Sequence, residues 1–163
     1  MKTLLKIIIA FLMVSKVFSA ELKIEVFGSD NYFKYDVSET QKFFVWSNNA
    51  VFLTDIGING SVECKGILEI IDSISSSNIM CKWTETNGDN FYAQFFVSRG
   101  SVDQDATVQK FEFLSGEGRW EEMVGQKCLG AYTPLVNSKF MWQGKCDITN
   151  KTLERVKNYK KPE

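Results

Sequence analysis

The chain has no histidine among its 163 residues and only two prolines. Without histidine, Ser-His and Cys-His nucleophile pairs, imidazole general bases and zinc sites with histidine ligands are all excluded. Charged residues make up 24% of the chain and hydrophobic residues 44%, a balance that argues against a disordered chain. The length therefore predicts one domain with a single hydrophobic core.

Long hydrophobic runs are absent after the first twenty residues. At the start, two lysines precede an unbroken apolar run at residues 7–14, which is too short to cross a bilayer. We therefore predict that residues 1–20 are a secretory signal peptide, cleaved after Ser19 or Ala20. The mature protein is then expected to be secreted or periplasmic, with no membrane span. A first helix buried in the fold is the alternative.

A basic surface is lacking over most of the chain. Residues 21–148 carry 11 basic and 18 acidic side chains, whereas residues 149–163 carry five basic and two acidic ones. Because nucleic acid requires a basic footprint, it is not expected as a partner. The expected division is a signal peptide (1–20), a β-barrel domain (21–148) and a short basic C-terminal tail (149–163), solvated or with a helical turn or two.

No C-x-x-C pair occurs, and four cysteines are spread over the predicted mature chain: Cys64, Cys81, Cys128 and Cys146. An even number of cysteines in an oxidising compartment predicts two disulfides, for which three pairings are possible. Separations of 17 and 18 residues match the length of a hairpin and favour Cys64–Cys81 with Cys128–Cys146. A metal site is the competing interpretation, but the spacing disfavours it, so we expect neither a metal nor a cofactor.

Turn-forming residues interrupt the chain roughly every eight to twelve residues, which predicts an all-β sandwich or barrel. The clearest hairpin signal is Asn87-Gly88, typical of a type I′ turn in which both central residues have positive φ. Breaks are expected at 28–31 and 47–49. Isoleucine spacing over 67–74 also fits a short helix, although the β-branched run favours a strand. The expected strands are residues 22–26, 42–46, 51–53, 61–71, 79–86, 90–98, 108–114, 118–124, 127–132 and 139–148.

One short segment resembles a known signature. Residues 115–120 read Ser-Gly-Glu-Gly-Arg-Trp, with Gly125 five residues later. This segment resembles the G-G-T-G-[KR]-[FY] turn of allene oxide cyclases, dirigent proteins and exported bacterial relatives of unknown role. The turn at 87–89 is similar to a D-G-D turn of the bacterial proteins, and Trp142-x-Gly144 suits their closing strand. The resemblance implies a small closed antiparallel barrel of about eight strands in meander order.

The signature is incomplete, because Ser115 and Glu117 stand where the family has glycine and threonine. No catalytic residue of the cyclases matches a position in this chain, so none is transferred. From the residues themselves, Gly116 and Gly118 predict a tight reversal with positive φ. A phosphate-binding loop is disfavoured, because no helix start or Lys-Ser/Thr end follows. The expected turn glycines are Gly88, Gly116, Gly118 and Gly125.

Aromatic residues are the most suggestive feature, because the four tryptophans fall on four different expected strands. A small eight-stranded barrel is either filled by its side chains or holds one small ligand. Trp83 and Trp120 lie mid-strand and are expected to be largely buried. The candidate barrel-lining residues are Trp46, Trp83, Phe95, Trp120 and Trp142.

Carboxylates are the only acid-base candidates in a chain without histidine. Four glutamates are expected on strands, and one that points into the barrel would have a raised pKa. The sequence does not tell which of them faces inward, and we assign no catalytic residue. These glutamates are Glu63, Glu69, Glu85 and Glu112.

The favoured function is an exported, non-enzymatic β-barrel that binds a small apolar ligand or another protein. One alternative is a cyclase or isomerase that acts on an apolar substrate inside the barrel, as the resemblance permits. Another is a purely structural or inhibitory module that acts through its surface. An apolar cavity would favour the binding protein, a cavity with an inward ionised group the enzyme, and a filled barrel the surface module.

Overall fold

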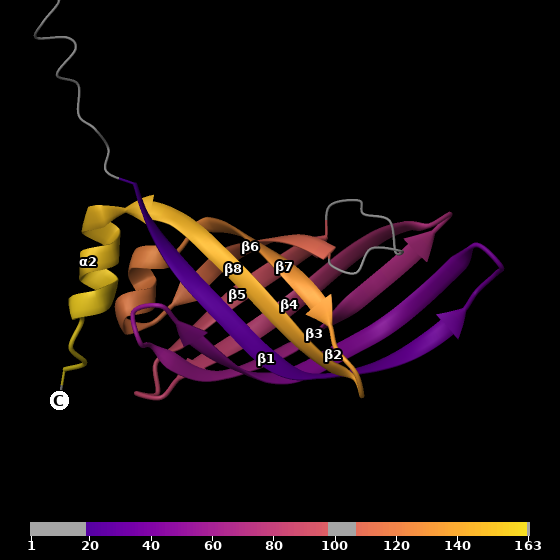
Figure 1. The fold of residues 1–163 in the computed structure, drawn as a ribbon, viewed down its shortest axis with the longest axis horizontal. Helices are drawn as coiled ribbons and strands as arrows, with labels where there is room; N and C mark the ends of the chain where they lie inside the picture. The colour runs from indigo at the N-terminus through magenta and orange to yellow at the C-terminus, as the bar shows by residue number, and fades with distance from the viewer. Residues whose placement is uncertain (1–18, 98–106, 163) are drawn as a thin grey trace, which may run out of the picture.

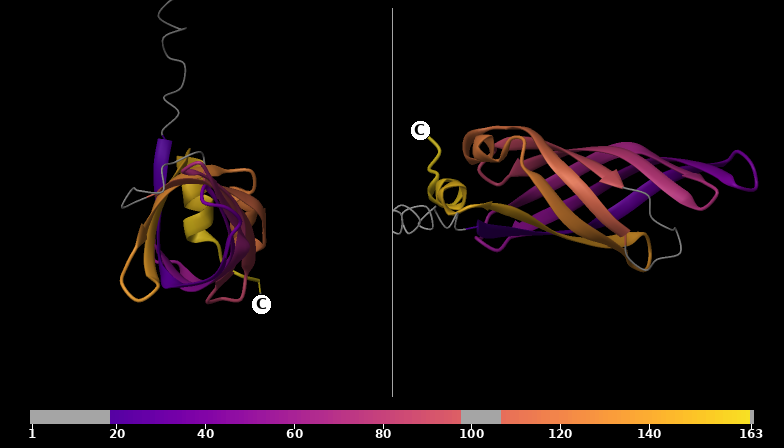
Figure 2. Two further views of the ribbon diagram at one scale, coloured as in Figure 1. Left: turned by 90° about the vertical axis from the view of Figure 1, so that its right-hand side faces the viewer. Right: turned by 90° about the horizontal axis from the view of Figure 1, so that it is seen from above.

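Eight antiparallel strands follow one another around a closed barrel in the computed structural model, which describes residues 19–97 and 107–162 (Figure 1). Each strand pairs with its neighbour in sequence, and β1 pairs with β8 to close the ring seen end-on in Figure 2. The expected all-β meander barrel is confirmed. Residues 1–18 of the predicted signal peptide lie outside the described part. The strands are β1 (Ser19–Asp36), β2 (Gln41–Thr54), β3 (Asn59–Ile71), β4 (Ile74–Glu85), β5 (Asn90–Val97), β6 (Thr107–Gly116), β7 (Lys127–Pro134) and β8 (Lys139–Thr149).

The barrel interior follows from period-two alternation along the strands, because successive side chains point to opposite faces. In β1, for example, Leu22, Ile24 and Val26 are buried. The same alternation buries Trp83 on β4, which is 0% exposed, as expected. No helix in the described ranges is long and apolar enough to cross a membrane.

Strands β1 and β2 run through the two breaks expected at 28–31 and 47–49, so both expected breaks are wrong. Gly28 is not a turn residue: a Cβ there would lie 2.5 Å from the Cβ of Ala50 on the neighbouring strand. Glycine at this position therefore allows close packing between β1 and β2. In β2, Asn48 is buried and Asn49 exposed, which is the alternation of a strand and not a turn.

Two hairpin turns have positive φ at both central residues. Asp72 (48°) and Ser73 (64°) join β3 to β4, and Asn137 (57°) and Ser138 (55°) join β7 to β8. These are the signs of a type I′ turn, whose twist matches that of the flanking strands. The strand preferred over a helix at 67–74 is confirmed, interrupted only by this two-residue turn.

The turn between β4 and β5 has one left-handed residue, Gly88 (φ 88°), so the type I′ turn expected at Asn87-Gly88 is wrong. The Gly88 N–H donates to the Glu85 carbonyl (2.8 Å). The Asn87 side chain accepts from the Asp89 N–H at 2.8 Å. This side-chain bond stabilises a longer loop in which Asn87 needs no positive φ.

The segment expected as a strand at 118–124 is instead a short 3-10 helix, η1 (Gly118–Met123). Gly118 (φ 60°) and Gly125 (φ 80°) supply the left-handed residues at its two ends, but Gly116 does not have positive φ. At Gly116 a Cβ would lie 2.6 Å from the Trp120 carbonyl oxygen, so glycine serves close packing there. Trp120 is 0% exposed, as expected, but on a helical turn and not a strand.

The basic C-terminal segment forms a helix, α2 (Asn150–Asn158), which lies across one end of the barrel (Figures 1 and 2). Thr149 caps it by accepting a hydrogen bond from the Thr152 N–H at 3.0 Å. Val156 is completely buried. Of the two forms expected for residues 149–163, the helical turns are confirmed, and one apolar side of the helix covers the barrel end.

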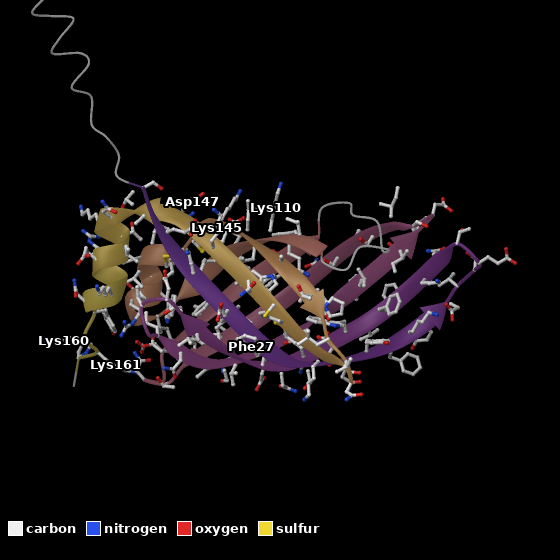
Figure 3. All side chains as sticks on the ribbon, viewed as in Figure 1. Phe27, Lys110, Lys145, Asp147, Lys160 and Lys161 are labelled. Atoms are coloured by element: carbon white, nitrogen blue, oxygen red, sulfur yellow. A yellow bond between two sulfur atoms is a disulfide. The ribbon has the colours of Figure 1, made fainter. Side chains whose placement is uncertain are left out.

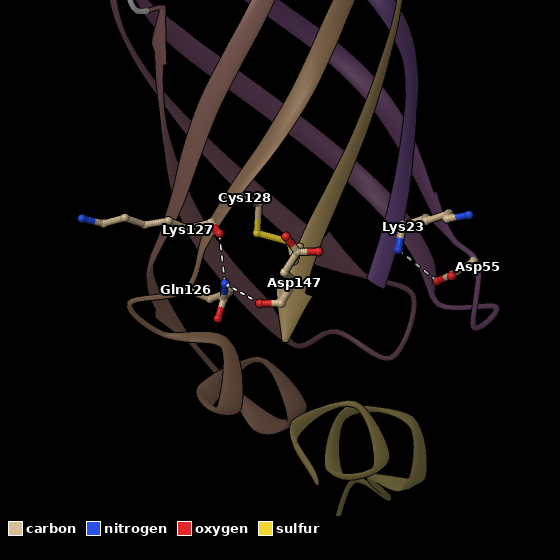
Figure 4. The surroundings of a disulfide bond; sticks show 7 residues. Lys23, Asp55, Gln126, Lys127, Cys128 and Asp147 are labelled. Carbon is tan, nitrogen blue, oxygen red and sulfur yellow. Dashed lines mark hydrogen bonds between the residues drawn. A yellow bond between two sulfur atoms is a disulfide. The ribbon is translucent and has the colours of Figure 1, made fainter. Parts of the chain in front are cut away.

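Both favoured disulfides are present. Cys64–Cys81 joins β3 to β4 at directly opposed positions, and Cys128–Cys146 joins β7 to β8. Beside the second bridge, the Gln126 amide donates to the carbonyls of Lys127 and Asp147, at 2.9 and 3.1 Å (Figure 4). The predicted pairing is confirmed, because each pair lies in one antiparallel hairpin.

Candidate functional site

The half of the barrel next to η1 and α2 is filled by stacked aromatic rings. Phe91 lies in the middle of the stack, with its ring centroid 4.3 Å from that of Trp120 and 5.0 Å from that of Trp83. Farther along the barrel, the Trp142 ring meets the Phe95 ring edge-on at 5.4 Å. All five side chains are buried. These rings fill this half of the barrel, so the barrel is not hollow along its whole length.

A small cavity remains beyond this stack. About 30 Å³ of space there is wide enough for the centre of a water molecule. A cavity of that volume holds about one or two water molecules. The wall is mostly apolar and aromatic, with polar side chains from Asn48, Gln109 and Tyr132. Tyr132 and Gln109 are half-buried, so they mark the side nearer to solvent.

Four of the five candidate lining residues come together around this cavity: Trp46, Trp83, Phe95 and Trp142. Trp120 does not line it, because η1 places its ring at the other end of the stack. Trp142 lies flat against the backbone of β7 and β8: a Cβ at Gly144 would come within 2.0 Å of the indole, and one at Gly130 within 2.2 Å. The glycines therefore make the room that this large side chain occupies.

Three side chains of the cavity wall each carry a buried polar atom that has no hydrogen-bond partner among the described residues: Asn48 (Oδ1), Trp83 (Nε1) and Trp142 (Nε1). The side chains that carry them are only 6%, 0% and 3% exposed. Buried polar groups are nearly always paired, since an unmade hydrogen bond costs about 1–3 kcal/mol. One acceptor and two donors around one cavity therefore favour an occupant with polar atoms.

A carboxyl–phenol pair lies beside the cavity. The Tyr132 hydroxyl, which lines the cavity, donates a hydrogen bond to Oδ2 of Asp30, while Oδ1 of Asp30 is buried without a partner in the described ranges. Burial raises the pKa of Asp30 to about 6, against the smaller opposing effects of hydrogen bonds from Tyr132 and Trp46. Burial and the nearby Asp30 also raise the pKa of Tyr132. Asp30 is therefore the acid-base group whose pKa lies nearest to neutral pH in this part of the barrel.

The raised pKa of Asp30 predicts a pH dependence of stability. The folded protein binds this proton more tightly than the unfolded chain does. The contribution of this proton to the free energy of unfolding is therefore fully present below about pH 4 and is lost as the pH rises through about 6. Asp30→Asn should remove that part of the slope. Urea unfolding of both proteins at pH 4, 5, 6 and 7 measures it, and Asp147→Asn, a change at an exposed carboxylate of the neighbouring strand β8, is the control. Equal slopes for Asp30→Asn and the parent would contradict the burial described here.

A second buried carboxyl group, Glu85, lies at the closed end of the barrel, and it is the one glutamate of the four that is buried. It accepts a hydrogen bond from the Trp120 indole (2.9 Å) and forms an ion pair with Arg119, whose Nε lies 3.3 Å away. Burial raises its pKa, while Arg119 and Trp120 partly oppose that rise. Arg119 also donates to the Val156 carbonyl (2.9 Å) and so ties η1 to α2.

The C-terminal lysine Lys161, labelled beyond α2 in Figure 3, completes this end. Its ammonium lies 2.8 Å from Asp89 and donates to the Asn87 carbonyl at 3.0 Å. Together these contacts make the Glu85 group a structural clamp between β4, η1 and the C-terminus. Glu85 does not line the cavity, and its Oε2 already contacts both Trp120 and Arg119, so we assign it no chemistry.

Sequence reasoning missed three residues of the cavity region: Asp30, Asn48 and Tyr132. The first two stood in segments expected to be turns, because aspartate and asparagine are common there. A signal was present in the period-two pattern, since Asn48 is separated by even intervals from the inward-facing Trp46 and Phe52. Among the described residues, no group of three or more acidic or cysteine side chains is arranged to hold a metal ion.

Comparison with protein-family models finds no match for the chain, and comparison with curated proteins finds none either. The evidence for the eight-stranded closed barrel is therefore the structure itself and not similarity to a known family. The case for a function rests on the cavity and its polar groups.

Proposed function

We propose that the protein is an exported, non-enzymatic binding protein whose barrel interior holds one small molecule with a polar end. The observation that carries this proposal is that three side chains around one mostly apolar cavity, Asn48, Trp83 and Trp142, each carry a buried polar group with no partner in the part of the chain that the structure describes. A packed core without a binding role would be expected to place apolar atoms there, since each unpaired group lowers stability.

The chemistry of the three groups suggests the ligand class. Both indoles donate, and the Asn48 Oδ1 accepts, so a hydroxyl group can satisfy both kinds by accepting from an indole and donating to the amide oxygen. The aromatic walls suit an apolar body attached to that hydroxyl. We therefore propose a small uncharged alcohol. Because the open space holds only about one or two water molecules, the half-buried side chains of Trp46 and Tyr132 must move outward to admit it.

Export of the protein is part of the proposal. It is supported by the short apolar run at the start of the sequence and by two disulfides, which persist in oxidising compartments. We propose that a signal peptide within residues 1–20 is cleaved after Ser19 or Ala20, at the start of β1, and that the remaining chain is one folded unit, since α2 covers the barrel end. N-terminal sequencing of exported protein should begin at Ala20 or Glu21.

The indole N–H resonances test ligand binding directly. We expect benzyl alcohol to shift the Trp83 and Trp142 indole signals in ¹H–¹⁵N spectra of the purified oxidised protein, and toluene, which lacks the hydroxyl, to bind more weakly. Trp120 is the internal control, because its N–H is already bonded to Glu85 outside the cavity. Asn48→Leu should abolish the preference for the alcohol.

Two results would contradict the proposal. One is equal affinity for both probes, or none. The other is a high-resolution structure in which ordered water alone satisfies all three groups, combined with native mass spectra of protein from its own host that show the bare polypeptide mass. Those results together would leave a filled barrel that acts through its surface.

A second candidate function, isomerisation or cyclisation of an apolar substrate, is favoured by one observation. Asp30 has a pKa of about 6, its Oδ1 is buried without a hydrogen-bond partner among the described residues, and Tyr132, which binds its other oxygen, lines the cavity. A general acid or base works best with a pKa near the working pH. The resemblance of residues 115–120 to the allene oxide cyclases points the same way. This candidate requires turnover that is lost in Asp30→Asn, whereas the binding protein retains its affinity for benzyl alcohol in that variant.

A further inference from the structure

Strand β1 extends well beyond the strand that pairs with it on one side. The last pair between β1 and β8 is Ser29 with Lys139, whereas pairing between β1 and β2 continues to Asp36 with Lys42. The β1–β2 hairpin therefore projects past β8, at the right of Figure 1. No described residue pairs with residues 31–36 of β1 on that side. We call this segment the free β1 edge.

The hydrogen bonds at the two ends of the edge show which backbone groups are unpaired. The Val37 N–H donates to Gln41 at the end of β2 (2.9 Å), and the Asp30 N–H donates in the opposite direction, to Ser138 (2.8 Å). Because these directions alternate along a strand, odd-numbered residues bond to β2. The free edge thus presents the backbone N–H and C=O groups of Tyr32, Lys34 and Asp36.

The outer face next to this edge is aromatic. Phe33 is 61% exposed and Tyr35 52%, and their ring centroids lie 4.8 Å apart. Val45, opposite Phe33 on β2, is 49% exposed. An unpaired strand edge beside exposed aromatic rings is a template for pairing with another strand.

We infer that the free β1 edge pairs antiparallel with the same edge of a second copy, in a two-fold symmetric dimer centred on Tyr35. The unpaired backbone groups belong to even-numbered residues. They can bond to each other only when even-numbered residues of one copy oppose even-numbered residues of the other. A centre at Lys34 would oppose two lysines, and a centre at Phe33 would oppose Asp36 with Asp30 of the other copy. A centre at Tyr35 opposes Lys34 with Asp36 of the other copy twice, next to the ion pair that Lys34 and Asp36 form within each chain (2.7 Å), so charge complementarity selects it.

The ends of the edge also fit a second copy. In this register the β1–β2 turn of one copy, where Val37 is 59% exposed, reaches the β7–β8 turn of the other. That turn carries Leu135 and Val136, which are 48% and 81% exposed. The pairing would thus cover apolar side chains at both ends of the shared strands. This inference does not depend on the proposed ligand.

Charge exchange tests the register. Sedimentation equilibrium of the oxidised protein should show a monomer–dimer equilibrium, and Lys34→Glu or Asp36→Lys alone should weaken it on the order of tenfold or more. The double variant, with both changes in one chain, should restore it. An equimolar mixture of the two single variants should also associate, because each then meets its opposite charge. A protein that stays monomeric up to about 1 mM, or variants that behave alike, would overturn the inference.

Single cysteines distinguish the possible centres. Tyr35 would face its own counterpart as a non-hydrogen-bonded pair about 4.5 Å apart at Cα, within reach of a disulfide. Tyr35→Cys should therefore form a covalent dimer on mild oxidation, with the two native disulfides intact by peptide mapping. Phe33→Cys should not, because its counterpart would lie about 13 Å away along the strand. Cross-linking at position 33 or 34 in place of 35 would refute the proposed register.

Discussion

Replacing Trp120 by alanine is expected to lower the free energy of unfolding by about 3–5 kcal/mol, the usual range for truncating a buried tryptophan. Trp120 is completely buried, and its ring packs 4.3 Å from Phe91 and 6.3 Å from Phe52. Trp83→Ala should cost a similar amount, since Trp83 is equally buried in the same stack. Urea unfolding followed by far-ultraviolet circular dichroism measures both. Losses below about 1 kcal/mol at both positions would show that these rings do not form the core.

Phenylalanine variants separate packing from hydrogen bonding at the same two positions. Both changes replace an indole with a smaller phenyl ring, but only Trp120→Phe removes an existing hydrogen bond, the one from the indole to Glu85. Trp83→Phe removes a donor that has no partner in the described part of the chain. Because a broken buried bond to a charged group costs about 1–3 kcal/mol, Trp120→Phe should be the more destabilising change. The reverse order would mean that the Trp83 indole has a partner in solution.

The burial of the tryptophans could be predicted, but the element that carries Trp120 could not. Alternation along a strand and helical spacing both allow a buried residue at that position, and Arg119 to Glu122 contain no turn residue that would signal a 3-10 helix. The deciding contact is tertiary: Trp120 must reach across to Glu85 on β4, 35 residues earlier in the chain. No local pattern encodes that distance. The barrel closure was likewise implied by the resemblance and not by the residues alone.

Whether the polar side chains of the candidate site point into the barrel depends on the register between β1 and β2. Asn48 was expected in a turn, yet the pairing of Asp30 with Asn48 across β1 and β2 points both side chains inward. A shift of one residue would have put both on the outside. Only the long ladder between β1 and β2 sets that register, so the sequence could indicate the tryptophans of the cavity wall but not the acid and amide beside them.

Removing either disulfide should lower the free energy of unfolding by about 3 kcal/mol in the chain-entropy model. The two bridges close loops of nearly equal length, with sequence separations of 17 and 18 residues. The double variants Cys64→Ala/Cys81→Ala and Cys128→Ala/Cys146→Ala should therefore lose similar amounts, within about 1 kcal/mol of each other. Urea unfolding at pH 7 gives both values against the parent protein.

The comparison between the two bridges tests where the stabilisation arises. In the folded protein their surroundings differ: Cys64 and Cys81 line the cavity, whereas the Gln126 amide ties the strands beside Cys128 and Cys146 (Figure 4). If the bridges act mainly by limiting the unfolded chain, these differences matter little and the losses are equal. If folded-state packing dominates, the Cys64–Cys81 variant should differ clearly, because its missing sulfur atoms enlarge an existing cavity. Losses below about 1 kcal/mol for both variants would contradict the entropic account. They would mean that closing these loops does not restrict the unfolded chain enough to stabilise the fold.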